Sequence, residues 1–143
     1  MTPEEYIQNR VDDQISWYNK KSGINKKYHY QAKVWVIIFS AMIPFATGIN
    51  SEMTPWMDYF IGVLGIVIVI LTAVSTLYKF QDKWSNYRRT AELLTHEKYL
   101  FQTNSGSYGS HKDPFKLLVY RVENTINEEV ASWNKYTNEE DKE

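Results

Sequence analysis

One uncharged stretch in the middle of the chain constrains the fold more than any other feature. The twenty residues Tyr59–Tyr78 include no Asp, Glu, Lys or Arg. With a rise of about 1.5 Å per residue, a helix of this length spans about 30 Å, the thickness of a bilayer's hydrocarbon core. A second uncharged run, Val34–Ser51, lies just upstream. One such helix could be buried in a soluble protein, but two in succession predict a transmembrane hairpin.

The composition of the whole chain hides this pattern. Its 143 residues are 23% charged and the mean hydropathy is −0.47, values typical of a soluble protein. These averages do not show that the apolar residues are concentrated in the middle third. A net charge of −1 gives no argument for a nucleic-acid partner. The absence of cysteine excludes disulfides and thiolate metal sites. The acidic, polar N-terminus lacks the apolar core of a signal peptide.

A helix is predicted to lead into the first uncharged run. Thr2, Pro3 and Glu5 match a capping box with proline at the first helical position. Only Gly23 offers a local break, so residues 3–49 are expected to be mostly helical. Apolar residues spaced by four, four and three form one face of this helix: Ile7, Val11, Ile15 and Tyr18.

The second uncharged run is predicted to continue as a helix beyond the membrane. Neither proline nor glycine occurs between Gly65 and Thr103. We therefore expect one helix over Pro55–Gln102, about 70 Å long. Spacings of four and three residues continue along it as a heptad-like seam: Phe80, Trp84, Tyr87, Ala91, Leu94, Lys98 and Phe101.

A loop and a last helix are predicted for the remaining residues. Asn104–Lys112 is rich in Gly, Ser and Asn, and Asp113 followed by Pro114 is a helix start. The apolar stripe from Phe115 to Trp133 needs a surface to cover it, which the helix extensions provide. The bundle that results is expected to pack around four aromatic residues: Trp17, Trp84, Tyr87 and Trp133.

The lysines and arginines predict the orientation. None occurs between Val34 and Tyr78, whereas both flanks are basic, so the positive-inside rule places both termini in the cytoplasm. The protein is then a multi-pass protein of the cell inner membrane. Five lysines are expected to contact lipid headgroups, with solvated charge near the membrane as the alternative: Lys26, Lys27, Lys33, Lys79 and Lys83.

These predictions combine into an all-α membrane protein of one domain, in which a two-span hairpin extends into a cytoplasmic helical bundle with a C-terminal helix. The domain is residues 1–136, followed by an acidic tail, residues 137–143. Its predicted parts are a cytoplasmic helix (1–33), a first span (34–51), a second span (55–78), a helix extension (79–102) and a C-terminal helix (113–136).

Catalytic and metal-binding patterns are absent from the sequence. His29, His96 and His111 are isolated, and no nucleophile motif or phosphate loop occurs. We expect no enzyme activity and no cofactor. Five charged residues form a cluster at helical spacing: Arg88, Arg89, Glu92, Glu97 and Lys98. Glu92 stands four residues after Arg88 and three after Arg89, which predicts ion pairs along one helix face.

Hydroxyl groups are the polar features of the spans, and ionisable groups that could relay protons or sense voltage are missing. Ser40 and Thr72 fall at similar depth, so a hydrogen bond between them across the helices is one reading. Lining a narrow pore is the other, for Ser40, Thr72, Ser75 and Thr76. Glu52 and Asp58 would then stand at the outer mouth.

Three stretches resemble the SLATT family, the SMODS- and SLOG-associating two-transmembrane effector domains. They are DDQISWYNKKSGINKKYHY (Asp12–Tyr30), FQDKWSNYRRTAELLTHEKYLF (Phe80–Phe101) and RVENTINEEVASW (Arg121–Trp133). The resemblance implies a membrane effector of bacterial conflict systems that forms pores when a nucleotide-signalling or sensor module fires. A soluble sensor protein is the partner it implies, and no catalytic residues belong to the family.

The leading hypothesis is a homo-oligomeric ion channel or pore. Two spans cannot enclose a pore, so a parallel tetramer or pentamer is expected, with the second span nearer the axis because of its glycines and hydroxyls. The alternative is a membrane-anchored scaffold whose cytoplasmic helices bind a soluble partner. A third reading, an enzyme acting on lipid, has no support from any residue.

Overall fold

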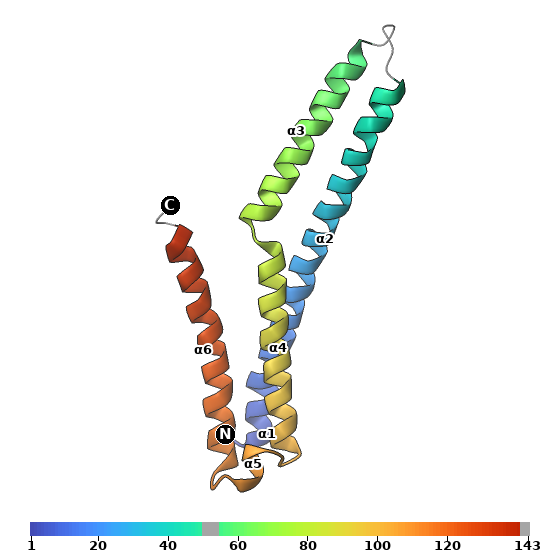
Figure 1. Ribbon diagram of the computed structural model, residues 1–143. Helices are drawn as coiled ribbons and strands as arrows, with labels where there is room; N and C mark the ends of the chain where they lie inside the picture. The colour runs from blue at the N-terminus through green and yellow to red at the C-terminus, as the bar shows by residue number, and fades with distance from the viewer. Residues whose placement is uncertain (50–54, 141–143) are drawn as a thin grey trace. The chain divides into compact units, whose positions relative to one another are not determined.

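The protein consists of helices joined by short turns in the part described by the computed structural model (Figure 1). This confirms the predicted all-helical class. The structure describes residues 1–49 and 55–140, and the side chains of residues 1–48 and 55–135. The elements are α1 (Pro3–Tyr6), the π-helical turn η1 (Ile7–Val11), α2 (Asp12–Ile49), α3 (Trp56–Leu77), α4 (Phe80–Gln102), α5 (Ser107–Ser110) and α6 (Pro114–Glu140).

The N-terminal capping box is confirmed. The Glu5 amide donates to the Thr2 hydroxyl at 3.2 Å, and the Thr2 amide donates to the Glu5 carboxylate at 2.9 Å. Helix α2 then runs without a break through Gly23 and Pro44. The break considered at Gly23 therefore does not occur, and the chain is helical from Pro3 to Ile49 with a single π-helical turn.

The predicted continuous helix over Pro55–Gln102 is wrong. Helix α3 ends at Leu77, Tyr78 and Lys79 form a turn, and α4 begins at Phe80. Lys79 has a φ of 47°, in the left-handed region, and its amide donates to the Thr76 carbonyl at 3.2 Å. This is the terminal geometry usually supplied by glycine, so no sequence signal marked it.

An aromatic stack accompanies the turn. The rings of Tyr78 and Phe80 stack at 5.5 Å, and the Phe80 ring also stacks on Tyr28 of α2 at 5.8 Å. Residues two apart point in nearly opposite directions on a continuous helix, so the first of these contacts requires the break. Aromatic pairs of this kind contribute about 0.5–1.5 kcal/mol each, which offsets the strain of a left-handed lysine.

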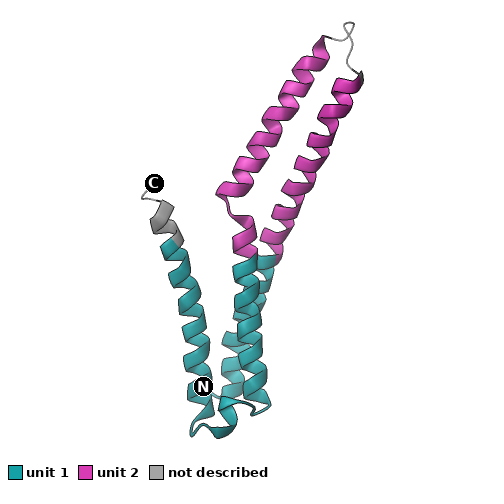
Figure 2. Ribbon diagram, viewed as in Figure 1, with its two compact units in different colours: residues 1–22, 85–143 teal, residues 23–84 magenta. Residues whose placement is uncertain are grey.

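Two compact units divide the described chain: unit 1 is residues 1–22 and 85–143, and unit 2 is residues 23–84 (Figure 2). In unit 1, side chains from the N-terminal helical segments, α4, α5 and α6 form one hydrophobic core. The core consists of Tyr6, Ile7, Val11, Tyr18, Ala91, Leu94, Tyr108, Leu118, Val122 and Ile126. Members of all three predicted apolar stripes thus meet in it.

The segment between α4 and α6 differs from the predicted loop. A Schellman motif ends α4, with Asn104 at a φ of 51° and the Ser105 amide donating to the Leu100 carbonyl at 2.9 Å. Residues 107–110 then form the helical turn α5, which buries Tyr108 to 1% exposure. The burial of one tyrosine orders residues whose composition alone indicated a loop.

Helix α6 begins as predicted and ends later. The Asp113 carboxylate accepts from the Lys116 amide at 3.3 Å, which confirms the helix start before Pro114. The helix extends to Glu140, beyond the predicted end at residue 136, so part of the predicted acidic tail is helical. Residues 141–143 lie outside the described chain.

Unit 2 contains two helical stretches that are long and apolar enough to cross a membrane. One ends at Gly48 and the other begins at Trp56, and only 6% of each apolar window is buried. Phe45, Tyr59 and Leu77 are each more than 70% exposed. The core helix of a soluble protein would be mostly buried, so this exposure favours the predicted hairpin. The turn of the predicted hairpin lies outside the described residues.

Candidate functional site

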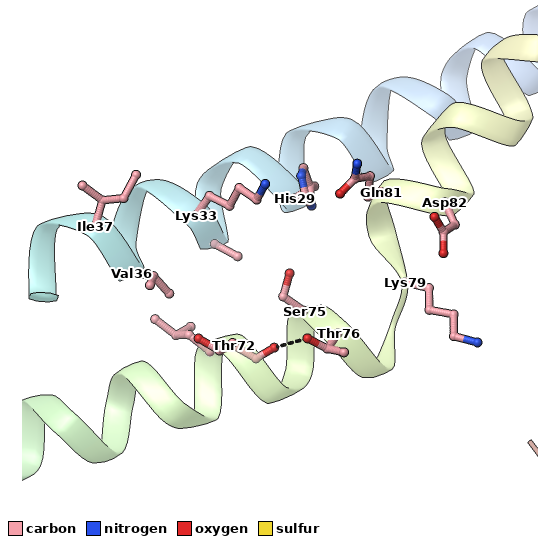
Figure 3. A pocket seen from close by; sticks show the side chains of 12 residues that line it. His29, Lys33, Val36, Ile37, Thr72, Ser75, Thr76, Lys79, Gln81 and Asp82 are labelled. Carbon is pink, nitrogen blue, oxygen red and sulfur yellow. Dashed lines mark hydrogen bonds between the residues drawn. The ribbon is translucent and has the colours of Figure 1, made fainter.

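A cavity of about 650 Å³ lies between α2 and α3 within unit 2, near the turn at Lys79 (Figure 3). One end is polar and the other is apolar, because the helices run antiparallel and bring the basic end of α2 opposite the hydroxyls of α3. The lining residues are His29, Ala32, Lys33, Val36 and Ile37 from α2, Leu71, Thr72, Ser75 and Thr76 from α3, and Lys79, Gln81 and Asp82 beyond it.

Helix periodicity relates two further span hydroxyls, Ser40 and Thr47, to the residues that line the cavity. On α2, Ser40 and Thr47 follow Lys33 at intervals of seven residues and so share its face. On α3, Gly65 precedes Thr72 by seven residues. Because Lys33, Thr72 and Thr76 line the same cavity, both rows belong to one side, named here the polar flank: Lys33, Ser40, Thr47, Gly65, Thr72 and Thr76.

Large apolar side chains occupy the other sides of the hairpin. Phe45 is 71% exposed and lies about 140° around α2 from Ser40 by helix periodicity. Ile70 and Leu77 are 55% and 76% exposed and lie about 140–160° around α3 from Thr72. The hairpin therefore presents one narrow flank of small and hydroxyl residues and a wide apolar surface.

The threonine hydroxyls of the spans bond to their own helices. Thr47 donates to the Ile43 carbonyl at 2.9 Å, and Thr72 donates to the Ile68 carbonyl at 2.8 Å. Thr76 donates to the Thr72 carbonyl at 2.9 Å. The alternative of a hydrogen bond between Ser40 and Thr72 is therefore not found. Since each hydroxyl proton is used, the outward-facing atoms are oxygen lone pairs and methyl groups.

The polar end of the cavity holds a buried histidine and an unpaired lysine. His29 is 8% exposed, and its imidazole has no hydrogen-bond partner within residues 1–49 and 55–140. Burial lowers the pKa of His29, and the charge of Lys33 lowers it further, so the imidazole is neutral at pH 7. Lys33 has no carboxylate partner in the same ranges. Asp82 supplies the carboxylate among the lining residues.

The remaining predicted contact residues are dispersed over unit 2. Lys26 lies over the rings of Tyr30 and Trp84, at 6.0 and 5.7 Å from their centroids. Lys83 lies 5.8 Å from the centre of the Tyr78 ring. The other three are exposed and outside the cavity lining: Lys27, Ser40 and Asp58. Glu52, the other predicted outer-mouth residue, lies outside the described residues.

Three of the four predicted packing aromatics come together in unit 1. The Tyr87 ring lies 5.7 Å from both Trp17 and Trp133. Trp84 belongs to unit 2, where its ring faces the Lys26 ammonium group. The heptad-like spacing grouped Trp84 with Tyr87, but the cation–π contact gives Trp84 a different environment.

Sequence reasoning missed a set of carboxylates that join the helices of unit 1. Glu97 accepts hydrogen bonds from the Tyr108 hydroxyl and from Arg121, the latter at 3.3 Å. Glu123 accepts from Arg10 at 3.0 Å and from the Tyr6 hydroxyl at 2.9 Å. Their positions in the sequence could have indicated these contacts, because Glu97 and Glu123 each stand directly beside a member of a predicted apolar stripe.

Two further contacts complete this set. Glu129 accepts from the indole of Trp133 and from the Tyr18 hydroxyl at 3.4 Å. Lys98 donates to Asp12 at 2.5 Å across two helices. The predicted pairing along one helix face is confirmed only for Arg88 with Glu92, at 2.5 Å. Glu97 and Lys98 use partners from other helices instead.

Burial and these bonds shift the acidities in unit 1. Burial raises the pKa of Tyr18 to about 12, and the neighbouring Glu129 carboxylate adds to the shift. Burial also raises the pKa values of Tyr6 and Tyr108, each bonded to a glutamate. Burial raises the pKa of Glu129 as well. These groups belong to unit 1, and none of them lines the cavity of unit 2.

The fold and the cavity define a small all-helical protein with two helices able to cross a membrane. No group of three His, Asp or Glu side chains suited to a metal occurs in the part of the chain that the structure describes. Residues 13–116 match the family described as "Protein of unknown function (DUF4231)", and the chain belongs to that family. No curated protein and no solved structure matches the chain.

Proposed function

We propose that this chain is an integral membrane protein whose copies associate through their two apolar helices and enclose an ion-conducting pore. The polar flank is the observation that carries the proposal. Within an otherwise apolar hairpin, Thr72 and Thr76 line the cavity. Helix periodicity puts Ser40 and Thr47 near the face of α2 that carries Lys33, another lining residue. Copies that turn this flank toward a common axis place oxygen atoms along a path and leave the bulky apolar surface to lipid.

Small residues on the same side support close approach of neighbouring copies. Gly65 lies on the flank, and adding a Cβ atom there would meet nothing within 4 Å. The space is therefore open in a single chain and available to a second one. All copies share one membrane orientation, so a closed ring with cyclic symmetry is the arrangement that follows. A tetramer or pentamer remains our proposal for its size.

The chain is proposed to lie in the inner membrane of a bacterium with both termini in the cytoplasm. This rests on the lysines and arginines that flank the spans and on their absence between Val34 and Tyr78. Single cysteines at Ser51 and Ser105 test it, since the chain has no cysteine of its own. Labelling from opposite sides of sealed vesicles is expected. Labelling of both from the cytoplasmic side would exclude the hairpin.

The biological role is proposed from the resemblance to SLATT proteins. The family to which the chain belongs is described without a function. A two-span effector that opens a pore on a signal from a sensor would need a membrane hairpin and soluble surfaces for control. The helices of unit 1, with their hydrophobic core, are the part proposed to receive that signal.

Ion flux from liposomes tests the pore. Replacing Ser40 or Thr72 by leucine fills the polar flank and is expected to reduce flux at least tenfold. Ala41→Leu and Ala73→Leu are matched controls, because each adds a similar volume one residue away, about 100° around the helix. Native mass measurements on every variant establish that the oligomer persists.

The outcomes separate the pore from the scaffold. Flux lost only in the flank variants supports the pore. Equal flux in all four variants rejects the assignment of the polar flank. No flux to any small ion from a preparation shown to be oligomeric rejects the pore and favours a membrane-anchored scaffold.

A further inference from the structure

The cavity between α2 and α3 contains polar groups that the proposed pore does not account for. His29 is more than nine-tenths buried, lines the cavity and has no hydrogen-bond partner in the described residues. The ring nitrogens of His29 are not among the fully buried polar atoms that lack a partner in the described residues, so they reach the open space of the cavity and are available to a ligand. Lys33 stands one helical turn away on the same lining, without a carboxylate partner in residues 1–49 and 55–140.

A hydroxyl group and the start of α4 also line the cavity. The Ser75 side chain projects from α3 toward α2 (Figure 3), and no side-chain hydrogen bond of its hydroxyl occurs in the described chain. Helix α4 begins at Phe80, and Gln81 of its first turn lines the cavity. The amides of a first helical turn lack partners within the helix and favour negative charge.

The charges at the polar end favour an anion. Lys33 and Lys79 are cationic, and Asp82 is the opposing charge, so the lining carries a net charge of +1 with neutral His29. A neutral imidazole still offers one N–H donor. Asp82 stands at the α4 end, where the Lys79 side chain points outward from the cavity in Figure 3. An anion is therefore best placed near His29, Lys33 and Ser75, away from Asp82.

The apolar end decides what kind of anion fits. Val36, Ile37 and Leu71 line the cavity farther along the helices. A free phosphate would leave this surface uncovered, whereas a lipid covers it with an acyl chain. A volume of about 650 Å³ suits a headgroup and the first part of its chains. The site also lies at the ends of the apolar runs that face the basic segments, where anionic lipids concentrate.

We propose that this cavity is a binding site for one anionic phospholipid, whose phosphate is held by His29, Lys33 and Ser75 and whose acyl chain lies against Val36, Ile37 and Leu71. The proposal rests on the placement of both helices in a membrane, as proposed above, and not on the pore. The site lies at one end of the polar flank, so a bound lipid adjoins the proposed ion path.

Native mass spectrometry of the full chain in mild detergent tests the site with dioleoyl phosphatidylglycerol and dioleoyl phosphatidylcholine. Retention of phosphatidylglycerol over phosphatidylcholine is expected. Lys33→Gln should lower that retention about fivefold, the effect of one lysine at a membrane surface. Lys20→Gln is the matched control, because Lys20 is an exposed lysine on the same helix, outside the cavity and not among the predicted headgroup contacts. His29→Phe, which keeps a ring but loses the N–H, should also lower retention.

Three results would overturn the proposal. Equal losses in the Lys33 and Lys20 variants would indicate general surface charge. Equal retention of the two lipids would remove the requirement for an anion. Displacement of the lipid by excess inorganic phosphate would assign the cavity to a free anion. Flux is measured on the same preparation, so lipid retained without flux rejects the pore alone, and flux without selective retention rejects the lipid site alone.

Discussion

The two units treat the same residue types in opposite ways. In unit 1, Leu94 and Leu118 are fully buried, and the apolar side chains of several helices converge on one core. In unit 2, Ile37 and Ile66 are 67% and 62% exposed. Burying an aliphatic side chain is worth about 1.5–3 kcal/mol in water, so unit 1 gains its stability internally. Unit 2 leaves that gain to its surroundings, which we propose to be lipid.

The two units also differ in how their polar side chains find hydrogen-bond partners. Unit 1 satisfies carboxylates with partners distant in sequence, as when Arg10 bonds Glu123. Unit 2 satisfies its threonine hydroxyls locally, through the carbonyl four residues earlier. The threonines of unit 1 do the same, so the long-range bonds of the carboxylates are what set unit 1 apart. Local satisfaction suits an apolar solvent, where no water completes a hydrogen bond. The exception in unit 2 is the polar end of its cavity, which is why that end carries the proposal of a ligand.

Truncating one large aliphatic side chain in each environment should give the largest difference. Leu94→Ala removes a fully buried side chain and should destabilise unit 1 by about 2–5 kcal/mol. Ile66→Ala removes an exposed one and should cost less than about 1 kcal/mol in detergent or lipid. Denaturant unfolding followed by fluorescence of the tryptophans measures both. A similar loss of stability in the two variants would mean that α3 is packed in a core, and the two units would then not differ in how they bury apolar side chains.

Breaking an ion pair should separate the polar networks of unit 1 from surface charge. The side chains of Glu97 and Arg121 are 18% and 33% exposed, and Tyr108 shares the carboxylate. Glu97→Gln should therefore cost about 1–3 kcal/mol. Arg88→Met breaks an exposed pair with Glu92 and should cost at most about 0.5 kcal/mol. If both variants melt alike, the Glu97 network contributes no more than a surface pair.

Local signals in the sequence predicted much of this fold. The apolar runs, the capping box at Thr2 and the helix start at Asp113 depend on residues close in the chain, and the structure confirms them. The break at Lys79 had no such signal. It depends on the stack of Phe80 with Tyr28, which lies on another helix and is a tertiary contact.

The candidate site was predictable only in parts. The sequence identified Lys33 as a headgroup contact and Thr72 as a pore-lining residue, on separate grounds. The structure places both at one cavity with Ser75, Thr76 and Lys79. Periodicity assigns a residue to a face of its own helix, but it does not show which faces of two helices meet. For the same reason isolated His29 drew no functional prediction.

Alkaline pH should unfold unit 1 selectively. The folded-state pKa of Tyr18 is raised to about 12, from an ordinary value near 10. The stability this gives is complete below about pH 10 and is lost as the pH rises toward 12. Tyr6 and Tyr108, whose pKa values are also raised, act in the same direction. Near-ultraviolet circular dichroism should therefore show a loss of packing in this range.

Tyr18→Phe isolates one of these phenols. The variant should lose about 1 kcal/mol at neutral pH, because the hydrogen bond to Glu129 is gone. Its alkaline transition should move to higher pH, since one fewer group must ionise. Tyr99→Phe is the control, because Tyr99 is 60% exposed. An unchanged alkaline midpoint in the Tyr18 variant would show that this phenol does not govern the transition.

The smallest predicted effect concerns the left-handed residue that follows the end of a helix, which occurs in both units. Lys79 after α3 and Asn104 after α4 both have left-handed φ values, 47° and 51°. Glycine removes a penalty of about 1–2 kcal/mol for a side chain in this region but adds chain entropy on unfolding. Lys79→Gly should therefore be more stable than Lys79→Ala by about 0.5–1 kcal/mol, and both variants lack the lysine side chain.

Asn104→Gly should gain less over the native residue, because asparagine tolerates the left-handed region. Thermal unfolding measures both pairs. A Lys79→Ala variant as stable as Lys79→Gly would mean that the helix continues through residue 79.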